Sequence, residues 1–543
     1  MNERKLAYSQ GLSDLPLRAE TIGQMWAGVV ADHGDCDALV SRQQGIRWTY
    51  AEMDKQVERC ARALIADGVQ KGDRVGIWAP NVAEWIVVQF ATARVGAIMV
   101  NINPSYRAHE LEFVLRQSGC TLLILAPGFH KADYRALLKA AETPALTRSV
   151  VLGGGWEALL ARADEISAEQ LAEREAELDF DEAINIQYTS GTTGFPKGAM
   201  LSHHNILNNG FFIGETLAYT PDDRVCLPVP FYHCFGMVLG NMAIVTHGAC
   251  IVIPGEGFIP REVLETVEAE RCTSLYGVPT MFIAELASPE LEKTDFSSLR
   301  TGIMAGSPCP IETMKRVQSE MHMGEVTICY GMTETSPVST QTRLDDPLEK
   351  RVTTVGPVHP HVEVKIIDPE SGRTVRRGET GELCTRGYCV MLGYWDDEEA
   401  TRDVIDPARW MHTGDLATMD DEGYVNIVGR IKDMIIHGGE NIYPREIEEF
   451  LYSHPAIVDV QVIGIPDPKF GEAICAWIIR RQGSELDAKG VKDFCRSQIA
   501  RYKIPRYVRF VDSFPMTISG KIQKYKMRET EIEERGLTEL ETA

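Results

Sequence analysis

The hydrophobic pattern changes along the chain, and its first part predicts an α/β protein. Over roughly the first four hundred residues, short apolar runs alternate with longer segments of helical periodicity. The runs that predict strands are 74–78, 121–126, 250–253, 274–276, 300–304 and 326–330. The segments that predict helices are 82–96, 107–118, 261–271 and one that starts at Ile311. Such alternation is typical of layered folds with largely parallel sheets, so we expect stacked α/β layers.

The pattern becomes different after Val364. Shorter strands and frequent glycines predict a β-rich subdomain that continues to about residue 430. The last part has a compact pattern of its own, with predicted helices at 444–453 and 488–500 and predicted strands at 456–463 and 473–479. A chain of 543 residues is too long for one ordinary core. We therefore predict a large domain over residues 1–430 and a small α+β domain over residues 431–543.

One segment is unusually dense in groups that bind anions. Residues 188–198 read Tyr-Thr-Ser-Gly-Thr-Thr-Gly-Phe-Pro-Lys-Gly, between a predicted strand at 184–187 and a predicted helix at 202–218. Glycines let backbone N–H groups approach a phosphate, hydroxyls add donors, and Lys197 adds a positive charge. The segment therefore predicts a polyphosphate cradle, although a plain surface loop is the alternative. It is not the usual P-loop, because Gly198 replaces the Ser or Thr that follows the lysine there.

Composition excludes some classes of function. Apolar residues make up 44% of the chain and charged residues 24%, as in a soluble globular enzyme. The net charge of −23 disfavours nucleic acid as a general partner, because phosphate backbones are bound by clustered Lys and Arg. The acidity is uneven, since residues 480–528 contain 13 Lys or Arg and only 4 Asp or Glu. This basic stretch is either a solvated helix face or a docking surface for an anionic cosubstrate.

The cysteines and the apolar segments indicate a compartment. Thirteen scattered cysteines without a CxxC pair fit reduced thiols in a cytoplasmic protein, not a disulfide framework or a zinc site. Residues 1–10 contain charges and no apolar run, so no secretory signal is expected. The most apolar helical segment, 82–100, is interrupted by Glu84, Gln89 and Arg94. It therefore predicts a buried helix, and no transmembrane segment is expected.

Further segments carry the groups that a nucleotide-dependent ligase needs. They are Tyr-Gly-Met-Thr-Glu at 330–334, Met-His-Thr-Gly-Asp-Leu at 411–416, Gly-Arg-Ile-Lys-Asp at 429–433, Gly-Gly-Glu-Asn-Ile-Tyr-Pro at 438–444 and Thr-Ile-Ser-Gly-Lys at 517–521. Together with the glycine-rich segment, and in this order, they closely resemble the adenylate-forming superfamily. That superfamily includes acyl-CoA synthetases, luciferases and peptide-synthetase adenylation domains. The likeness runs from about Trp48 to Met527 and is strongest to the fatty or medium-chain acyl-CoA ligase branch.

The resemblance implies an ATP site with defined roles. The implied nucleotide-binding residues are Thr189, Ser190, Gly191, Thr192, Thr193, Gly194, Lys197, Gly306, Ser307, Tyr330, Gly331, Asp415 and Arg430. The segment 189–197 would wrap the β- and γ-phosphates. Gly306-Ser307 and Tyr330-Gly331 would hold adenine, with the Tyr330 ring stacked on its face. Asp415 and Arg430 would bind the ribose.

The resemblance also implies catalytic residues and a moving domain. Lys521 matches the catalytic lysine, Thr333 would contact the α-phosphate, and Glu334 would hold Mg²⁺, which favours carboxylate and phosphate oxygens. Lys432 lies where the family has its hinge, so the small domain is expected to be mobile. Gly438 and Gly439 would flank the tunnel for the pantetheine arm of coenzyme A.

The implied reaction forms an acyl-adenylate from a carboxylic acid and ATP, and then transfers the acyl group to coenzyme A. Phe231, Phe235 and Met237 would line the acyl pocket, which predicts an apolar acid, with a medium-chain fatty acid favoured. His233 would lie near the carboxylate or gate the thiol channel, or is a core histidine. Cys234 is not expected to act as a nucleophile, because side chains of neighbouring residues usually point apart.

Several readings stay open beside this one. No Asp occurs between Phe231 and Gly240, which disfavours an amino-acid substrate, but aryl and short-branched acids remain. A carrier-protein thiol could replace coenzyme A as the acceptor. A catalytically silent nucleotide-binding protein and a luciferase-like oxygenase are further alternatives on this fold. The expected partners are small molecules, and a homodimer is allowed for.

Overall fold

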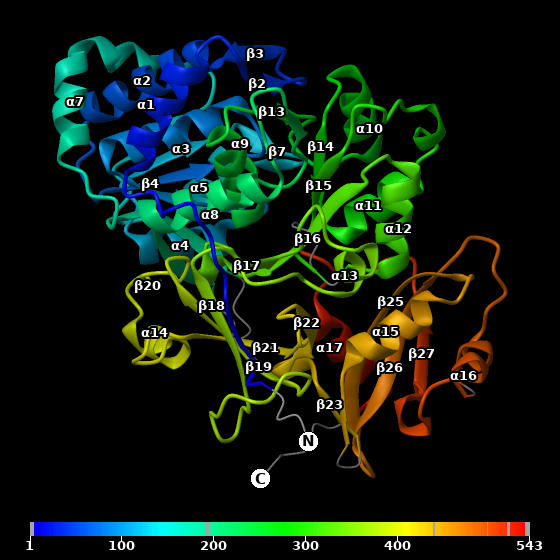
Figure 1. Ribbon diagram of the computed structural model, residues 1–543. Helices are drawn as coiled ribbons and strands as arrows, with labels where there is room; N and C mark the ends of the chain where they lie inside the picture. Colours follow the sequence, from blue (N-terminus) through cyan, green and yellow to red (C-terminus); the bar gives the residue numbers. More distant parts are fainter. Residues whose placement is uncertain are drawn as a thin grey trace.

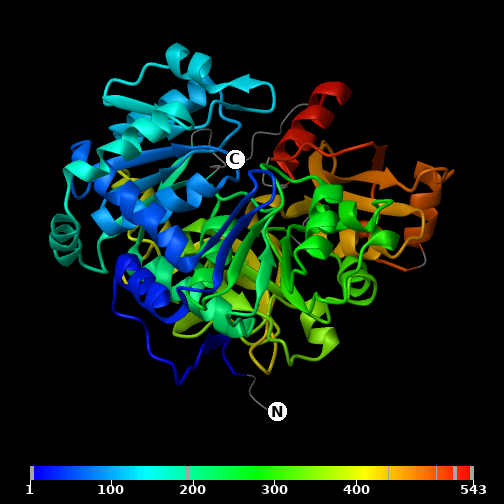
Figure 2. The same ribbon diagram turned by 90° about the horizontal axis from the view of Figure 1, so that it is seen from above.

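The protein contains two large parallel-rich sheets, a smaller antiparallel sheet and a separate C-terminal sheet (Figure 1). The computed structural model describes residues 5–189, 196–307, 309–437, 440–496, 498–517 and 522–537, and for residues 440 and 441 it describes the backbone alone. Predicted positions 190–194, 438, 439 and 521 lie outside these ranges. In both ribbon views the C-terminal unit lies to one side of the large sheets (Figures 1 and 2).

The first large sheet carries the strand before the glycine-rich segment. Its order is β20 (Gly393–Tyr394), β11 (Lys197–Ser202), β10 (Ala183–Thr189), β5 (Ile98–Asn101), β4 (Arg74–Trp78), β6 (Leu122–Leu125) and β9 (Arg148–Val151). The strands from β10 to β9 are parallel, and β11 and β20 are added antiparallel. The carboxyl end of β10 therefore leads directly into the predicted phosphate cradle.

The second large sheet carries the Tyr330–Glu334 segment. Its order is β17 (Val338–Gln341), β16 (Glu325–Gly331), β15 (Thr301–Met304), β14 (Ser274–Gly277), β12 (Arg224–Cys226), β13 (Cys250–Ile253), β2 (Asp37–Ser41) and β3 (Ile46–Thr49). All pairs from β16 to β2 are parallel, and the two edge strands are antiparallel. The segment thus leaves the sheet at a carboxyl end, where open α/β sheets place their ligands.

Two further sheets follow in the chain. The antiparallel one has the order β1 (Tyr8–Gln10), β18 (Val362–Ile367), β19 (Gly381–Gly387), β21 (Met411–Met419) and β22 (Val425–Arg430). The C-terminal one joins β24 (Glu440–Ile442), β23 (Ile435–His437), β26 (Gly471–Arg480) and β25 (Ile457–Asp467), with β27 (Tyr507–Phe510) paired to β26. A small hairpin, β7 (Gly128–Phe129) with β8 (Ala132–Asp133), lies apart from them.

Helices connect and cover these sheets. The longer ones are α1 (Ile22–His33), α2 (Tyr50–Ala66), α3 (Ala83–Val95), α4 (Ala108–Ser118), α7 (Ala168–Ala176), α8 (His203–Thr216), α10 (Pro260–Ala269), α11 (Pro279–Leu286), α12 (Ile311–Glu320), α15 (Pro444–Tyr452), α16 (Ala488–Arg496) and α17 (Lys524–Arg535). The shorter ones are α5 (Tyr134–Ala140), α6 (Gly154–Leu160), α9 (Ala243–Val245), α13 (Leu348–Thr353), α14 (Glu398–Val404), η1 (Ala161–Glu165), η2 (Phe235–Met242), η3 (Leu291–Lys293), η4 (Thr333–Thr335), η5 (Ile431–Asp433) and η6 (Arg501–Lys503). The predicted buried helix is confirmed, because α3 is buried on nearly all sides. Within the described residues, every helix is too short or too polar to cross a membrane.

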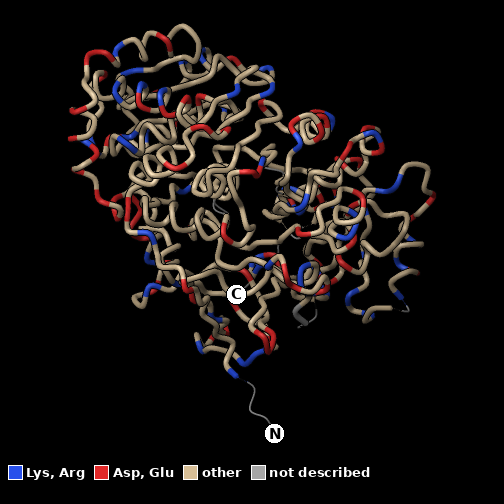
Figure 3. The backbone as a smooth tube through the Cα atoms, turned by 45° about the horizontal axis from the view of Figure 1, so that its top comes forward, with Lys and Arg blue, Asp and Glu red and all other residues tan. Residues whose placement is uncertain are grey.

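The cores separate where the sequence predicted a domain boundary. One continuous apolar core extends from Ala7 to Val425 and includes the three N-terminal sheets. Two smaller cores pack on the C-terminal sheet, and their members all follow residue 434. Strand β22 ends at Arg430 and β23 starts at Ile435 in a different sheet. Acidic and basic residues are interleaved along both parts (Figure 3). The division into domains 1–430 and 431–543 stays a prediction.

The structure differs from the sequence prediction after the glycine-rich segment. We predicted a strand, a turn and a helix, but β11 comes between the turn and α8. Strands β10 and β11 are antiparallel, with Thr189 opposite Lys197, so the segment joins two strands of a hairpin. Helix α8 begins only at His203, where the Ser202 hydroxyl caps it by accepting a hydrogen bond from the backbone N–H of Asn205. Lys197 is therefore the first residue of strand β11.

Candidate active site

The segment Tyr330–Glu334 forms the centre of the candidate site. It starts at the end of β16 and enters the short helix η4. At Gly331 a Cβ atom would lie 1.6 Å from the carbonyl oxygen of Pro337, so only glycine fits this close passage of two chain segments. The backbone N–H of Met332 donates to the same oxygen at 3.0 Å. These contacts fix the direction in which the side chains of Tyr330, Thr333 and Glu334 leave the sheet.

Tyr330 brings the two predicted ribose-binding residues together. Its hydroxyl donates to Asp415 Oδ2 at 2.6 Å, and Arg430 Nε donates to Asp415 Oδ1 at 3.1 Å. Asp415 and Arg430 face each other across β21 and β22. The three residues therefore form one hydrogen-bonded group, although they come from distant parts of the sequence. Their roles toward a nucleotide stay predictions.

The electrostatics of this group follow from burial. Burial raises the pKa of Asp415, while the Arg430 guanidinium opposes the shift. Burial and the neighbouring Asp415 also raise the pKa of Tyr330, so its hydroxyl keeps its proton. A buried carboxylate that accepts few hydrogen bonds is stabilised strongly by each further hydrogen-bond donor. The two hydroxyls of a ribose would be such donors for Asp415.

Glu334 lies in a second group with Lys197. The Glu334 side chain is buried, and its Oε1 accepts a hydrogen bond from the Tyr394 hydroxyl at 2.8 Å. Lys197 Nζ lies 5.1 Å from the centre of the Tyr394 ring, within the range of a cation–π contact. Tyr394 thus connects the predicted metal-binding carboxylate to the lysine beside the predicted phosphate cradle. A hard carboxylate oxygen in this position fits Mg²⁺ together with phosphate oxygens.

Thr333 lies in a third group with the residues around His233. The Cys234 sulfur is 3.6 Å from Thr333 Oγ1 and 3.5 Å from His233 Nδ1. The same His233 nitrogen accepts the backbone N–H of Phe235 at 3.2 Å. The assumption that the side chains of His233 and Cys234 point apart is therefore wrong. Cys234 has a helical backbone conformation as the N-cap of η2, and its sulfur lies near the His233 ring. Their geometry places both beside the predicted α-phosphate contact.

Two of the three predicted acyl-pocket residues belong to an unusual helix. Phe235 and Met237 lie in η2, a π-helix, a rare form that often occurs at functional sites. The Phe235 ring stacks on Tyr276 at 5.9 Å between ring centres. The Met237 sulfur accepts from Asn101 Nδ2 and Gln187 Nε2, both at 3.3 Å. Phe231 is buried as well, and the contact of these three residues with a substrate stays a prediction.

Other predicted positions lie around these groups or outside the described residues. Thr189 Oγ1 donates to the Lys197 carbonyl oxygen at 3.4 Å across the hairpin. Of the predicted adenine-binding pair, Gly306 has a φ of +91° and Ser307 is half-buried. The predicted hinge residue Lys432 is exposed in η5. The predicted positions that lie outside the described residues are Ser190, Gly191, Thr192, Thr193, Gly194, Gly438, Gly439 and Lys521. The roles of all of them stay predictions.

Sequence reasoning missed Tyr394. It lies in the short edge strand β20, which pairs with β11 so that Tyr394 is opposite Ala199. The sequence offered only a weak signal, an aromatic pair after Gly393 in a glycine-bearing stretch. Nothing in the spacing connects this stretch to Glu334, because the contact depends on how the edge strand is added to the sheet.

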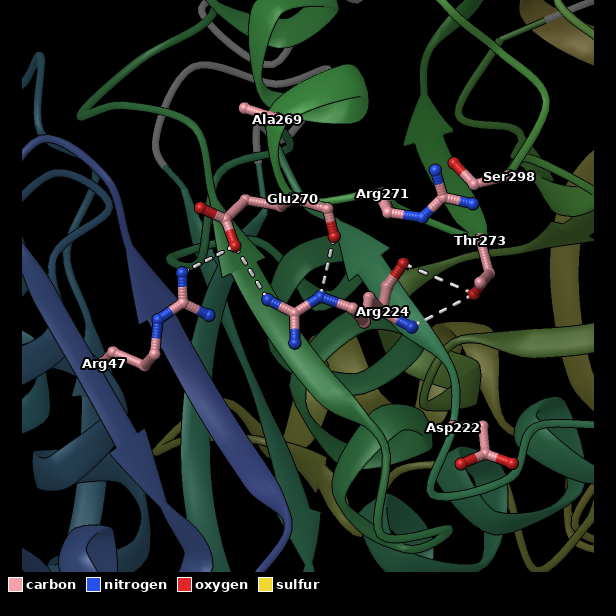
Figure 4. Close-up of a pocket in the computed structure, with 8 residues that line it drawn as sticks. All are labelled: Arg47, Asp222, Arg224, Ala269, Glu270, Arg271, Thr273 and Ser298. Carbon is pink, nitrogen blue, oxygen red and sulfur yellow. Dashed lines mark hydrogen bonds and ion pairs between the residues drawn. The ribbon is translucent and has the colours of Figure 1, made fainter.

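A hollow on the opposite edge of the second sheet does not share these features (Figure 4). It lies at the amino ends of β12 and β14, away from the edge where ligands of parallel sheets bind. Two of its three arginines, Arg47 and Arg224, already have an acidic partner, since both donate to Glu270 Oε2 at 2.8 Å. Arg224 also bonds Asp37. These contacts offset the charges of Arg47 and Arg224, which would otherwise attract an anion.

Comparison with known proteins identifies the family. The family described as AMP-binding enzyme matches residues 26–395, and the family described as AMP-binding enzyme C-terminal domain matches residues 446–521. The chain belongs to the AMP-binding enzyme family. The groups of Glu334 and of Thr333 lie within residues 26–395, whereas Asp415 and Arg430 of the Tyr330 group lie between the two matched ranges.

Individual relatives agree with this assignment. YngI of Bacillus subtilis, a putative acyl-CoA synthetase, is 50% identical over 535 residues, which is 94% of this chain and 97% of its own. The mitochondrial medium-chain acyl-CoA ligase ACSF2 of Danio rerio is 44% identical over 554 residues, covering 98% of this chain and 91% of its own. The crystal structure of ATP-bound MatB from Rhodopseudomonas palustris has a TM-score of 0.84 and 32% identity, covering 94% of this chain and 99% of that chain.

These comparisons confirm several predictions. The adenylate-forming assignment, the class of AMP-forming acid–thiol ligase and the use of ATP and coenzyme A are confirmed by the family and its relatives. The fold prediction is confirmed too, with parallel-rich α/β sheets, a β-rich part and a C-terminal α+β part. This AMP-binding enzyme therefore has the architecture on which the predicted site depends.

Replacing Asp415 with Asn should weaken ATP binding without lowering stability. Hydrogen bonds to a charged group contribute about 1.5–3 kcal/mol each, so the KM for ATP should rise about tenfold to a hundredfold. Because the pKa of Asp415 is raised in the fold, its ionised form lowers the free energy of unfolding once the pH exceeds the ordinary aspartate pKa. At pH 7 the melting temperature of Asp415→Asn should therefore equal or exceed that of the wild type.

Asp420→Asn is the matched control. Although burial opposes it, the hydrogen bond from Lys350 lowers the pKa of Asp420, so its ionised form stabilises the fold above the ordinary aspartate pKa. This variant should lose stability at pH 7 and keep the KM for ATP. Steady-state kinetics and thermal unfolding at pH 7 measure both quantities. An unchanged KM in Asp415→Asn would remove Asp415 from the nucleotide site.

Proposed function

We propose that this enzyme activates an apolar, medium-chain carboxylic acid with ATP and transfers the acyl group to coenzyme A. In the first step a carboxylate oxygen attacks the α-phosphorus of ATP, the bond to the bridging oxygen breaks, and pyrophosphate leaves. In the second step the thiol of coenzyme A attacks the acyl carbonyl, loses its proton, and AMP leaves. The observation that supports this proposal is the single segment Tyr330–Glu334, whose side chains take part in all three groups of the candidate site.

The first step brings two anions together, and the residues of the site would offset their repulsion. We place Lys197 beside the β- and γ-phosphates, Thr333 at the α-phosphate and Lys521 between the α-phosphate and the carboxylate. Preorganised charges and donors of this kind are often the largest contribution to catalysis. Glu334 would hold Mg²⁺, which would neutralise charge on the phosphate oxygens. Tyr394 would fix the orientation of Glu334 through its hydroxyl.

The second step requires Lys521 to leave and the thiol to enter. We propose that residues 431–543 rotate about Lys432 between the two steps, so that Gly438 and Gly439 come to line the path of the pantetheine arm. The change of sheet and core between Arg430 and Ile435 supports a hinge there. The basic stretch 480–528 would then face the phosphates of coenzyme A.

The proposed acid follows from the surface around helix η2. Buried Phe231, Phe235 and Met237 provide an apolar wall next to His233, and a relative with 44% identity is a medium-chain acyl-CoA ligase. A carrier-protein thiol as acceptor, and an aryl or short-branched acid as substrate, are the alternatives.

The cytoplasmic location and the homodimer stay predictions. Among the described residues no two cysteines form a disulfide.

Pyrophosphate release tests the proposal directly. The enzyme is given ATP and Mg²⁺ with linear acids from short to long chain and with aryl acids, each with and without coenzyme A. We expect turnover only with coenzyme A, with a maximum at a medium chain length. A burst that coenzyme A does not change would favour a carrier-protein acceptor, which a phosphopantetheinylated carrier then tests. No release with any acid would contradict the proposed reaction.

A further inference from the structure

Three side chains with donor atoms that can bind a metal ion converge on the antiparallel sheet, next to the predicted nucleotide site. Glu382 and Cys384 are two residues apart in β19, so both point to the same face. His412 lies directly opposite Cys384 on the neighbouring strand β21. Side chains of residues paired in this way are close enough to share a ligand. In the sequence His412 stands out only as part of the segment 411–416, and nothing in the spacing connects it with the other two residues.

The distances and the exposure of the three donors fit a metal site. The carboxylate oxygen, the thiol sulfur and the imidazole nitrogen all lie within 4.8 Å of one another. His412 Nδ1 donates to Glu382 Oε2 at 3.0 Å, and Cys384 Sγ lies 3.7 Å from the same nitrogen. Cys384 and Glu382 are buried, whereas the His412 side chain is 32% exposed. An ion could therefore enter from the His412 side and reach ligands that are already fixed.

The cluster is connected to the nucleotide group through an irregularity in β21. The register between β19 and β21 shifts between Glu382 and Cys384, so residues 413–415 bulge opposite a single residue. The second oxygen of Glu382 accepts the backbone N–H of Gly414 at 3.1 Å. Gly414 has a φ of +71° and is followed by Asp415, the predicted ribose ligand. Glu382 thus holds both His412 and the bulge that positions Asp415.

We propose that Glu382, Cys384 and His412 form a site for a zinc-like divalent cation. Thiolate, imidazole and carboxylate are the ligands that zinc takes in proteins, in a tetrahedral arrangement in which water can occupy the fourth position. Mg²⁺ would not compete, because it demands oxygen ligands in octahedral geometry. On binding, Cys384 loses its thiol proton to solvent. The neutral His412 ring releases its Nδ1 hydrogen to solvent and takes one up on Nε2, so that the Nδ1 lone pair can bind the ion.

Occupation of this site should inhibit adenylation, and this consequence rests on the proposed function. Once Glu382 binds an ion, its carboxylate moves toward the metal and its bond to the Gly414 N–H is weakened. The bulge then no longer holds Asp415 in place for the ribose. The cation therefore acts as an inhibitor that raises the KM for ATP, whereas ion binding itself does not depend on what the enzyme catalyses.

Cobalt binding tests the metal site without any assay of activity. The full-length enzyme, stripped with a chelator and kept in excess Mg²⁺, is titrated with Co²⁺ while the thiolate-to-cobalt charge-transfer band in the near ultraviolet is recorded. We expect one Co²⁺ per chain, displaced by Zn²⁺. Cys384→Ser and Cys384→Ala should both lose the band, and thermal unfolding shows which of them is folded. Cys36→Ser, which removes the half-buried Cys36 thiol, should keep the band. A band that survives in a folded Cys384 variant would overturn the site.

Inhibition forms a separate arm of the experiment. At fixed Mg²⁺, we expect Zn²⁺ to raise the KM for ATP at least tenfold in the wild type and to have little effect in the Cys384 variants. Equal inhibition of wild type and variants would show that Zn²⁺ acts elsewhere and would overturn the coupling. If no acid supports pyrophosphate release, the proposed function fails, while the cobalt titration still decides the metal site.

Discussion

Replacing Lys521 with Ala should nearly abolish formation of the acyl-adenylate and should spare thioester formation from acyl-adenylate supplied ready-made. The proposed role explains the difference, because Lys521 bridges the carboxylate and the α-phosphate only in the first step. Losing one preorganised donor of this kind lowers the rate by about 10²–10³. In a protein whose small domain turns away for the second step, the same lysine is not needed there.

The two half-reactions can be measured separately. Exchange of pyrophosphate into ATP reports the first, and release of AMP from supplied acyl-adenylate with coenzyme A reports the second. Lys139→Ala is the matched control, because Lys139 is an exposed lysine on α5, outside the basic stretch 480–528. It should change neither half-reaction. Equal loss of both half-reactions in Lys521→Ala would assign Lys521 a structural role and remove the domain rotation from the mechanism.

Much of the layered fold could be predicted because its strands have strong local signals. The strands at 74–78 and 250–253 were predicted with the bounds that β4 and β13 have in the structure. Both consist of buried, mostly apolar residues of a parallel sheet, so their pattern does not depend on distant neighbours. Strand β11 was missed for the opposite reason. Its residues follow a glycine-rich segment and lead into a helix cap, and its strand form comes from pairing with β10 and β20.

The site shows the same division between local and distant information. Glu334, Asp415 and Arg430 could be selected because each lies in a short segment with a recognisable set of polar groups. Their grouping could not be derived from composition or spacing, because Tyr330 reaches Asp415 only through the meeting of two sheets. Tyr394 and the cluster of Glu382, Cys384 and His412 depend entirely on strand pairing. Such residues can be recognised as members of a site only when the register of the paired strands is known.

Replacing Glu334 with Gln should lower the rate of adenylation by about 10²–10³ and raise the Mg²⁺ concentration needed for half-maximal activity. Glutamine keeps an oxygen that can accept the Tyr394 hydroxyl, so the local packing survives. It loses the negative charge that we propose binds the metal. Tyr394→Phe removes the hydroxyl and leaves the carboxylate, so we expect a smaller loss, about tenfold, with little change in the Mg²⁺ requirement.

Glu285→Gln separates a specific effect from the general effect of changing a buried glutamate. Glu285 is fully buried on α11, and burial raises its pKa well above the usual range, which favours the uncharged form of the side chain. Glutamine is close to it in shape and charge, and this control should keep both the rate and the Mg²⁺ dependence. Pyrophosphate exchange at increasing Mg²⁺ compares the three variants. If Glu334→Gln requires the same Mg²⁺ concentration as the wild type, other groups bind the metal. The role of Glu334 is then limited to its hydrogen bond with Tyr394.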